Sequence, residues 1–188
     1  MKKSKICIGT SNFAKKYGIN NNKFAKNELK NLFKFLGSKN ILYLDCADGY
    51  KNFNKFASEL KNFKIIFKIN FEKYRETKDI KKLIVRNLFI SKSKKFEAIL
   101  IHNIRYTSLK KLTSFIIFLK EIKKLKLTKK IGLSIYGLNE LYKIEKTNLD
   151  VDIIQIPLNI FDKTFTNEKL IYKFKKKGTQ FYARSIFL

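Results

Sequence analysis

Long apolar runs and clustered cysteines are both missing from this chain of 188 residues. No apolar stretch reaches the roughly 18 residues that a membrane-spanning helix needs. No long apolar segment follows the basic start, Met1–Phe13, as a secretory signal would require. The two cysteines, Cys7 and Cys46, lie far apart and form no Cys-x-x-Cys pair. We therefore expect buried, reduced thiols in a cytoplasmic protein without membrane contact.

Arginine is scarce in a chain whose formal net charge is +27. Such a charge favours nucleic acid or another anionic surface as a partner. However, the 42 basic residues include only these arginines: Arg75, Arg86, Arg105 and Arg184. Base readout and bidentate phosphate contacts favour arginine, and the lysines are spread along the whole chain. The pattern indicates a compositional bias, so nucleic-acid binding is disfavoured.

Proline and linker-like segments are also nearly absent, since Pro157 is the only proline. A single domain over residues 1–188 is expected. Short β-type runs alternate with longer amphipathic runs along it. The predicted strands are Lys5–Gly9, Ile41–Leu44, Lys64–Ile69, Ala98–Ile101, Lys130–Leu133, Asp152–Ile156 and Gln180–Ala183. The predicted helices are Lys23–Leu36, Phe53–Phe63, Asp79–Ile90, Leu109–Leu127, Leu138–Thr147 and Asn167–Lys177, with Gly37 and Gly178 as stops.

This alternation, with nearly all-apolar strands, predicts an α/β fold with a parallel sheet covered by helices. A dinucleotide-binding open sheet usually carries Gly-x-Gly-x-x-Gly after its first strand, whereas Ile8–Phe13 reads I-G-T-S-N-F. Strands spaced about 25–30 residues apart fit a parallel (β/α)8 TIM-type barrel better. A complete barrel usually takes about 250 residues. The predicted barrel is therefore incomplete, with about seven strands and no last βα unit.

Polar and ionisable side chains stand where the predicted strands end, which is where βα barrels carry their catalytic groups. These residues are Asp45, Asp48, Tyr50, Lys68, His102, Asn103, Ser134, Gln155, Asn159, Arg184 and Ser185. A buried Lys68 needs a counter-charge, which Asp45 can supply.

An aspartate, a tyrosine, a lysine and a histidine at one barrel mouth have a definite chemical use. A neighbouring ammonium lowers the pKa of a phenol, and the carboxylate holds that ammonium in place. The histidine orients a substrate carbonyl, and the tyrosine protonates its oxygen as a hydride reaches the carbon. Each residue also has a structural alternative. Lys68 can be a surface lysine, Tyr50 a loop tyrosine, His102 a structural histidine and Asp45 a helix cap.

Several segments resemble motifs of the aldo/keto reductase family. The main ones are L-D-C-A-D-G-Y (Leu44–Tyr50), I-I-F-K (Ile65–Lys68), I-L-I-H-N (Ile99–Asn103), I-G-L-S (Ile131–Ser134), I-I-Q-I-P-L-N (Ile153–Asn159) and A-R-S-I-F-L (Ala183–Leu188). The opening I-G-T-S-N-F is similar to the family's first strand and loop. These matches follow the family order over nearly the whole chain, and the Asp–Tyr pair with the downstream lysine and histidine is the specific part.

The resemblance implies an NAD(P)H-dependent reduction of a small carbonyl compound, without a metal. Asp45, Tyr50, Lys68 and His102 would be the catalytic tetrad, with Tyr50 as the general acid. NADPH is favoured over NADH by family habit. The residues expected along the cofactor are Gly9, Thr10, Ser134, Gln155, Arg184 and Ser185. The chain departs from the family pattern at Cys46, Lys51, Phe67 and Ile135.

The largest departure is the end of the chain, because the family binds the cofactor's pyrophosphate and adenosine mostly after strands seven and eight. From this we expect a fragment, a split-gene product or a decayed copy of a reductase. If 188 residues are its natural length, we expect weak cofactor binding and little or no activity. An open barrel would also expose the edge of its last strand, which invites pairing with another chain. A barrel-derived protein that binds a partner or itself through this edge is therefore the second hypothesis. A basic nucleic-acid-binding protein is the third.

Overall fold

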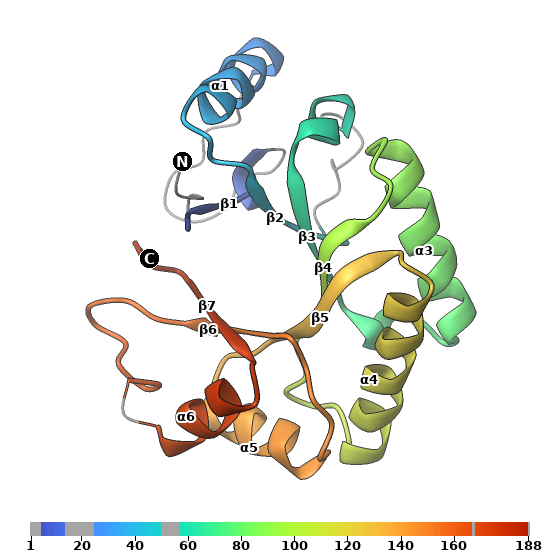
Figure 1. The fold of residues 1–188 in the computed structure, drawn as a ribbon, viewed down its shortest axis with the longest axis vertical. Coiled ribbons are helices and arrows are strands. Elements are labelled where there is room, and N and C mark those ends of the chain that lie inside the picture. Colours follow the sequence, from blue (N-terminus) through green and yellow to red (C-terminus); the bar gives the residue numbers. More distant parts are fainter. Residues whose placement is uncertain (1–4, 14–24, 50–56, 167, 188) are drawn as a thin grey trace.

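Parallel strands in sequence order form the centre of the fold (Figure 1). The computed structural model describes residues 5–13, 25–49, 57–166 and 168–187. Within them, one seven-stranded sheet runs in the order β1 to β7. Its strands are β1 (Cys7–Gly9), β2 (Tyr43–Ala47), β3 (Lys64–Ile69), β4 (Phe96–His102), β5 (Thr128–Ser134), β6 (Ile153–Pro157) and β7 (Gln180–Arg184). Each strand is parallel to its neighbour.

Helices connect successive strands and lie around the outside of the curled sheet (Figure 1). They are α1 (Lys26–Ser38), α3 (Thr77–Ile90), α4 (Leu109–Lys124), α5 (Leu138–Lys146) and α6 (Lys169–Lys176). The short 3-10 helices are η1 (Ser11–Phe13), η2 (Ala57–Asn62) and η3 (Phe71–Lys73). Helix α4 shows why this arrangement is stable, because its buried residues recur at helical spacing: Leu112, Phe115, Ile116, Leu119 and Ile122.

The apolar core has two layers, one on each face of the sheet. The larger layer packs the outward side chains of the strands, such as Phe67 and Ile99, against the helices. The smaller layer lines the inner face and consists of Ile66, Ala98, Leu100 and Ile153, with Cys7 and Tyr182 packed against it. Because side chains alternate along a strand, Lys68 follows Ile66 on the inner face and lies beyond this layer, towards the carboxyl end of the sheet.

The expected α/β barrel architecture is confirmed, and the part of the sheet that the structure describes is not closed. Among the described residues, β1 pairs only with β2, and β7 pairs only with β6. Each of these strands therefore keeps one edge without a sheet partner in the described part of the chain. None of the described helices is both long enough and apolar enough to cross a membrane.

Several helix ends differ from the prediction, and the described part of the predicted helix Phe53–Phe63 is the 3-10 helix η2. Helix α1 continues through Gly37, and its C-cap is Lys39, so Gly37 is not its stop. Helix α4 ends before Leu125 instead of at Leu127. The predicted stop at Gly178 is confirmed, because α6 ends just before this glycine, whose φ of +89° suits a residue without a Cβ.

Candidate active site

A hydrogen-bonded network of four side chains lies at the carboxyl ends of β2, β3, β5 and β6. The Lys68 ammonium lies 2.9 Å from Asp45 Oδ2 and 3.4 Å from Gln155 Oε1. The Gln155 amide donates to Asp45 Oδ2 at 3.1 Å, and the Ser134 hydroxyl donates to Gln155 Oε1 at 2.8 Å. Four residues that are up to 110 positions apart in sequence therefore share one site.

The ion pair at the centre of this network is buried. The side chains of Lys68 and Asp45 are 5% and 13% exposed. Burial of a charge is costly without a close partner, so the counter-charge expected for Lys68 is present. The network leaves one acceptor open, since Asp45 Oδ1 is buried and has no hydrogen-bond partner within the described residues.

Strand β1 and the residue after it, Thr10, hold the main chain of Asp45 in place. Gly9 pairs with Asp45 in the parallel register of β1 and β2. The Thr10 amide and hydroxyl both donate to the Asp45 carbonyl, each at 3.0 Å. Thr10 is itself buried. The polar groups of Thr10, predicted to lie along a cofactor, therefore hold the strand that carries Asp45.

His102, at the end of β4, is held in its neutral form. Burial lowers its pKa to about 4, and the positive charges of Lys68, Arg184 and Lys73 act in the same direction. An uncharged imidazole at neutral pH can donate or accept a hydrogen bond, depending on its tautomer. The ring nitrogen Nε2 of His102 lies 3.4 Å from the Tyr136 hydroxyl.

Tyr136, in the loop after β5, was not singled out by the sequence. The Arg184 guanidinium lies over its ring, 4.2 Å from the centroid, and donates to the Ile135 carbonyl at 3.0 Å. Arg184 also donates to the Ser185 hydroxyl at 3.3 Å. Arg184 and His102 therefore both contact the loop that follows β5. A tyrosine two positions after the end of the I-G-L-S motif is the sequence signal that could have pointed to it.

A second acidic group lies beside the network. Asp48 accepts hydrogen bonds from the Asn70 amide and the Tyr74 hydroxyl, at 3.4 and 3.3 Å. Burial raises the pKa of Asp48 despite the opposing charge of Lys73. Burial and the Asp48 carboxylate raise the pKa of Tyr74 to about 12. This cluster fixes the start of the β3–α3 connection, next to Lys68.

Tyr50, the predicted general acid, lies outside the described residues. The predicted site residues that the structure does describe are placed as follows. Asp45, Lys68, Ser134 and Gln155 share one network, while His102 and Arg184 meet at Tyr136. No group of three or more potential metal-binding histidine, cysteine or acidic side chains occurs in the described parts of the chain.

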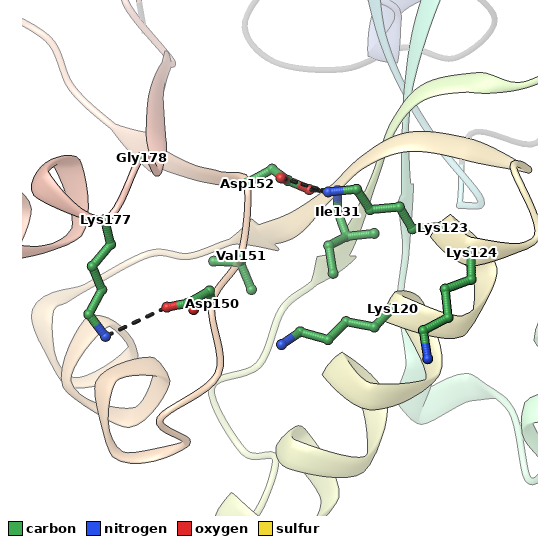
Figure 2. Close-up of a pocket in the computed structure, with 9 residues that line it drawn as sticks. All are labelled: Lys120, Lys123, Lys124, Ile131, Asp150, Val151, Asp152, Lys177 and Gly178. Atoms are coloured by element: carbon green, nitrogen blue, oxygen red, sulfur yellow. Dashed lines mark hydrogen bonds and ion pairs between the residues drawn. The ribbon is translucent and has the colours of Figure 1, made fainter.

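A cavity of about 440 Å³ lies at the opposite, amino-terminal end of the strands (Figure 2). Lysines from the ends of α4 and α6 surround an apolar floor that includes Ile131 and Val151. The Asp152 carboxylate accepts from Lys123 at 2.7 and 2.8 Å and from the Ile131 amide at 2.9 Å. These contacts tie α4 to the sheet, and catalysis in βα barrels belongs to the other end. We therefore assign the cavity a packing role.

Comparisons with known proteins agree with the fold. The sequence profile described as the aldo/keto reductase family matches residues 5–188. No curated protein matches the chain in sequence.

Similar solved structures share the architecture at low sequence identity. A proposed aldo-keto reductase from Pseudomonas aeruginosa superposes with a TM-score of 0.76 and 16% identity, over 94% of this chain and 71% of its own. A Bombyx mori aldo-keto reductase in complex with NADP gives a TM-score of 0.71 and 14% identity, over 96% of this chain and 62% of its own. A Brucella melitensis aldo/keto reductase gives 0.71 and 15%, over 96% and 68%. The chain thus spans roughly two thirds of the length of these proteins.

Proposed function

Because the chain belongs to the aldo/keto reductase family, we propose that it reduces an aldehyde or ketone to an alcohol with NADPH, or alternatively NADH. The observation that carries this proposal is the buried Lys68–Asp45 ion pair, which lies at the carboxyl end of the sheet together with a neutral His102. A buried ammonium held by a carboxylate is costly to desolvate, and buried charged groups with a specific partner cluster at functional sites.

The proposed roles follow from these surroundings. Lys68 acts on the phenol of Tyr50, five positions after Asp45, because a neighbouring ammonium favours the phenolate and makes the phenol a better acid near neutral pH. Asp45 holds the Lys68 ammonium in position. His102 is uncharged and therefore helps to orient the carbonyl without competing for the proton. Tyr50 gives its proton to the carbonyl oxygen, which becomes the alcohol.

The cofactor, when bound, supplies the hydride. We propose that Ser134 and Gln155 bind its carboxamide, because a hydroxyl and an amide complement the carboxamide's donors and acceptor. These two side chains now bond each other at 2.8 Å, so carboxamide binding has to replace that bond. We propose that Gly9, Thr10, Arg184 and Ser185 also lie along the cofactor, because they stand at or just after the carboxyl ends of β1 and β7.

The test is NADPH-dependent reduction of an aromatic aldehyde at high protein concentration, followed by the loss of NADPH absorbance. We expect a slow reduction that Tyr50→Phe lowers by at least about 100-fold, which is the contribution typical of a general acid. The far-UV circular dichroism of the variant should match that of the parent. Equal rates for the two proteins would exclude the Tyr50 mechanism.

A second candidate function is partner binding through the open sheet edge. It is favoured by the edges of β1 and β7, which have no sheet partner among the described residues, and by the exposed apolar side chains of Ile186 and Phe187 after β7. An unpaired strand edge can pair with another chain. A stable stoichiometric assembly in light scattering, combined with no NADPH-dependent turnover, would favour this function over the reductase.

A further inference from the structure

We propose that Tyr136 is a second hydroxyl at the carbonyl site, which accepts a hydrogen bond from His102 and donates its own to the substrate oxygen. The inference rests on the proposed reductase function and adds a residue to it. Under this arrangement, His102 acts as a positioning residue behind Tyr136, and Tyr136 is the group that touches the carbonyl.

The main chain of Tyr136 is fixed on both sides. The preceding Ile135 amide donates to the Gln155 carbonyl at 2.9 Å. The amides of Tyr136 and Gly137 both donate to one carboxylate oxygen of Glu140, at 2.7 and 2.9 Å. Glu140 is buried in the first turn of α5. Hydrogen bonds to a carboxylate are stronger than neutral ones, so this loop is anchored where it leaves the sheet.

The ring of Tyr136 is held as firmly as its main chain. Arg184 covers one face at 4.2 Å, a distance at which a guanidinium is attracted to an aromatic ring. The Arg184 side chain is itself tied to the Ile135 carbonyl at 3.0 Å. Tyr136 nevertheless stays 49% exposed, so its hydroxyl can be reached from the barrel mouth. Fixed placement and access to solvent are what a substrate-contacting group needs.

The contact between the Tyr136 hydroxyl and His102 Nε2, at 3.4 Å, is long for a hydrogen bond. Such contacts often tighten only when the substrate is present. Two arrangements of protons are possible. If the hydroxyl donated to Nε2, neither group would have a proton left for a carbonyl between them. If Nε2–H donates instead, the hydroxyl proton is free to point at the substrate oxygen.

The surroundings of His102 favour an uncharged ring in this pair. Burial opposes its protonation most, and the charges of Lys68 on β3, Arg184 on β7 and Lys73 on η3 act in the same direction. Tyr136 keeps its own proton throughout the reaction, because it stabilises the oxygen only through a hydrogen bond. The proton that the alcohol gains comes from the general acid.

The first experiment uses the fact that His102 is the only histidine. Long-range ¹⁵N–¹H NMR near pH 7 therefore reports on one imidazole without assignment. We expect a protonated, pyrrole-type Nε2 in the parent protein. Its ¹⁵N chemical shift should change in Tyr136→Phe. The matched control is Tyr142→Phe, since Tyr142 is 42% exposed and bonds Glu168 away from the site. A proton on Nδ1 in the parent, or an unmoved signal in Tyr136→Phe, overturns the inference.

The second experiment is kinetic. Loss of one neutral hydrogen bond should lower kcat/KM of Tyr136→Phe roughly tenfold, with Tyr142→Phe unchanged. If the parent reduces carbonyls and Tyr136→Phe is unaffected, this inference fails while the proposed function stands. If the parent reduces no carbonyl compound, the proposed function fails and the inference falls with it. The NMR result then shows whether the His102–Tyr136 contact exists by itself.

Discussion

Removing one partner of the Asp45–Lys68 pair should cost more stability than removing both. In Asp45→Asn, the buried Lys68 ammonium loses its carboxylate 2.9 Å away. In Lys68→Met, the Asp45 carboxylate loses the ammonium but keeps the amide of Gln155 at 3.1 Å. The double variant removes both charges and leaves neutral side chains of similar size. The three variants together form a double-mutant cycle.

The magnitude follows from the depth of the pair. At an effective dielectric constant of about 20, unit charges about 3 Å apart attract by roughly 5–6 kcal/mol, and desolvation offsets much of this. Breaking a buried pair from one side typically costs about 3–5 kcal/mol. We expect this value for Asp45→Asn. We expect less for Lys68→Met, because the Asp45 side chain is 13% exposed whereas the Lys68 side chain is 5% exposed. The double variant should lose only about 1–2 kcal/mol.

Urea unfolding followed by far-UV circular dichroism measures these free energies, because the slope with urea also reveals a change in compactness. The expected signature is a coupling energy of at least about 2 kcal/mol between the two sites. Additive effects, with a coupling below about 0.5 kcal/mol, would mean that the two charges do not depend on each other. The assignment of Asp45 as the group that holds Lys68 would then be wrong.

Two further predictions concern other parts of the same sheet. His102 should titrate near pH 4 in NMR, and a midpoint near its unfolded value of about 6.5 would contradict its burial. Because the folded pKa is the lower one, the unfolded chain takes up the proton first, and stability should fall by up to about 3 kcal/mol as the pH drops from about 6.5 to 4. Gly132→Ala should destabilise the protein by more than about 2 kcal/mol, since its Cβ would lie 2.0 Å from the Ile153 carbonyl oxygen of β6. Gly137→Ala is the control, because nothing lies within 4 Å of its Cβ. Similar urea midpoints for both variants would contradict the close approach of β5 and β6.

The strands could be predicted from the sequence because their signal is local. Each is a short apolar run between turn residues, and every predicted strand overlaps an observed one. The ends of the helices are harder to predict from the sequence, because they depend on which of the last backbone carbonyls accept a hydrogen bond. The turn after Gly37 closes when the Lys39 amide donates to Phe35 and Asn40 takes a φ of 54°. A non-glycine residue in that conformation gives no strong signal in the sequence.

The site could be predicted only as far as strand ends define it. That rule, with the resemblance, named Asp45, Lys68 and Gln155, and parallel register brought them together. It could not find Tyr136 or its contact with Arg184, because that contact joins a loop to a strand 48 positions further along the chain. The distance between such residues depends on how far the sheet curls, and sheet curvature is not encoded in any one segment.

Because of this network, the cofactor binding proposed above and the ion pair cannot be independent of each other. The amide of Gln155 donates to Asp45, and its oxygen lies near both Lys68 and Ser134. Any ligand that takes a hydrogen bond from Gln155 or Ser134 therefore changes what surrounds the Lys68 ammonium. In a site from which water is largely excluded, such a change has a larger electrostatic effect than it would at the surface. Gln155 thus links the side chains proposed to hold the nicotinamide to the charge proposed to activate the phenol.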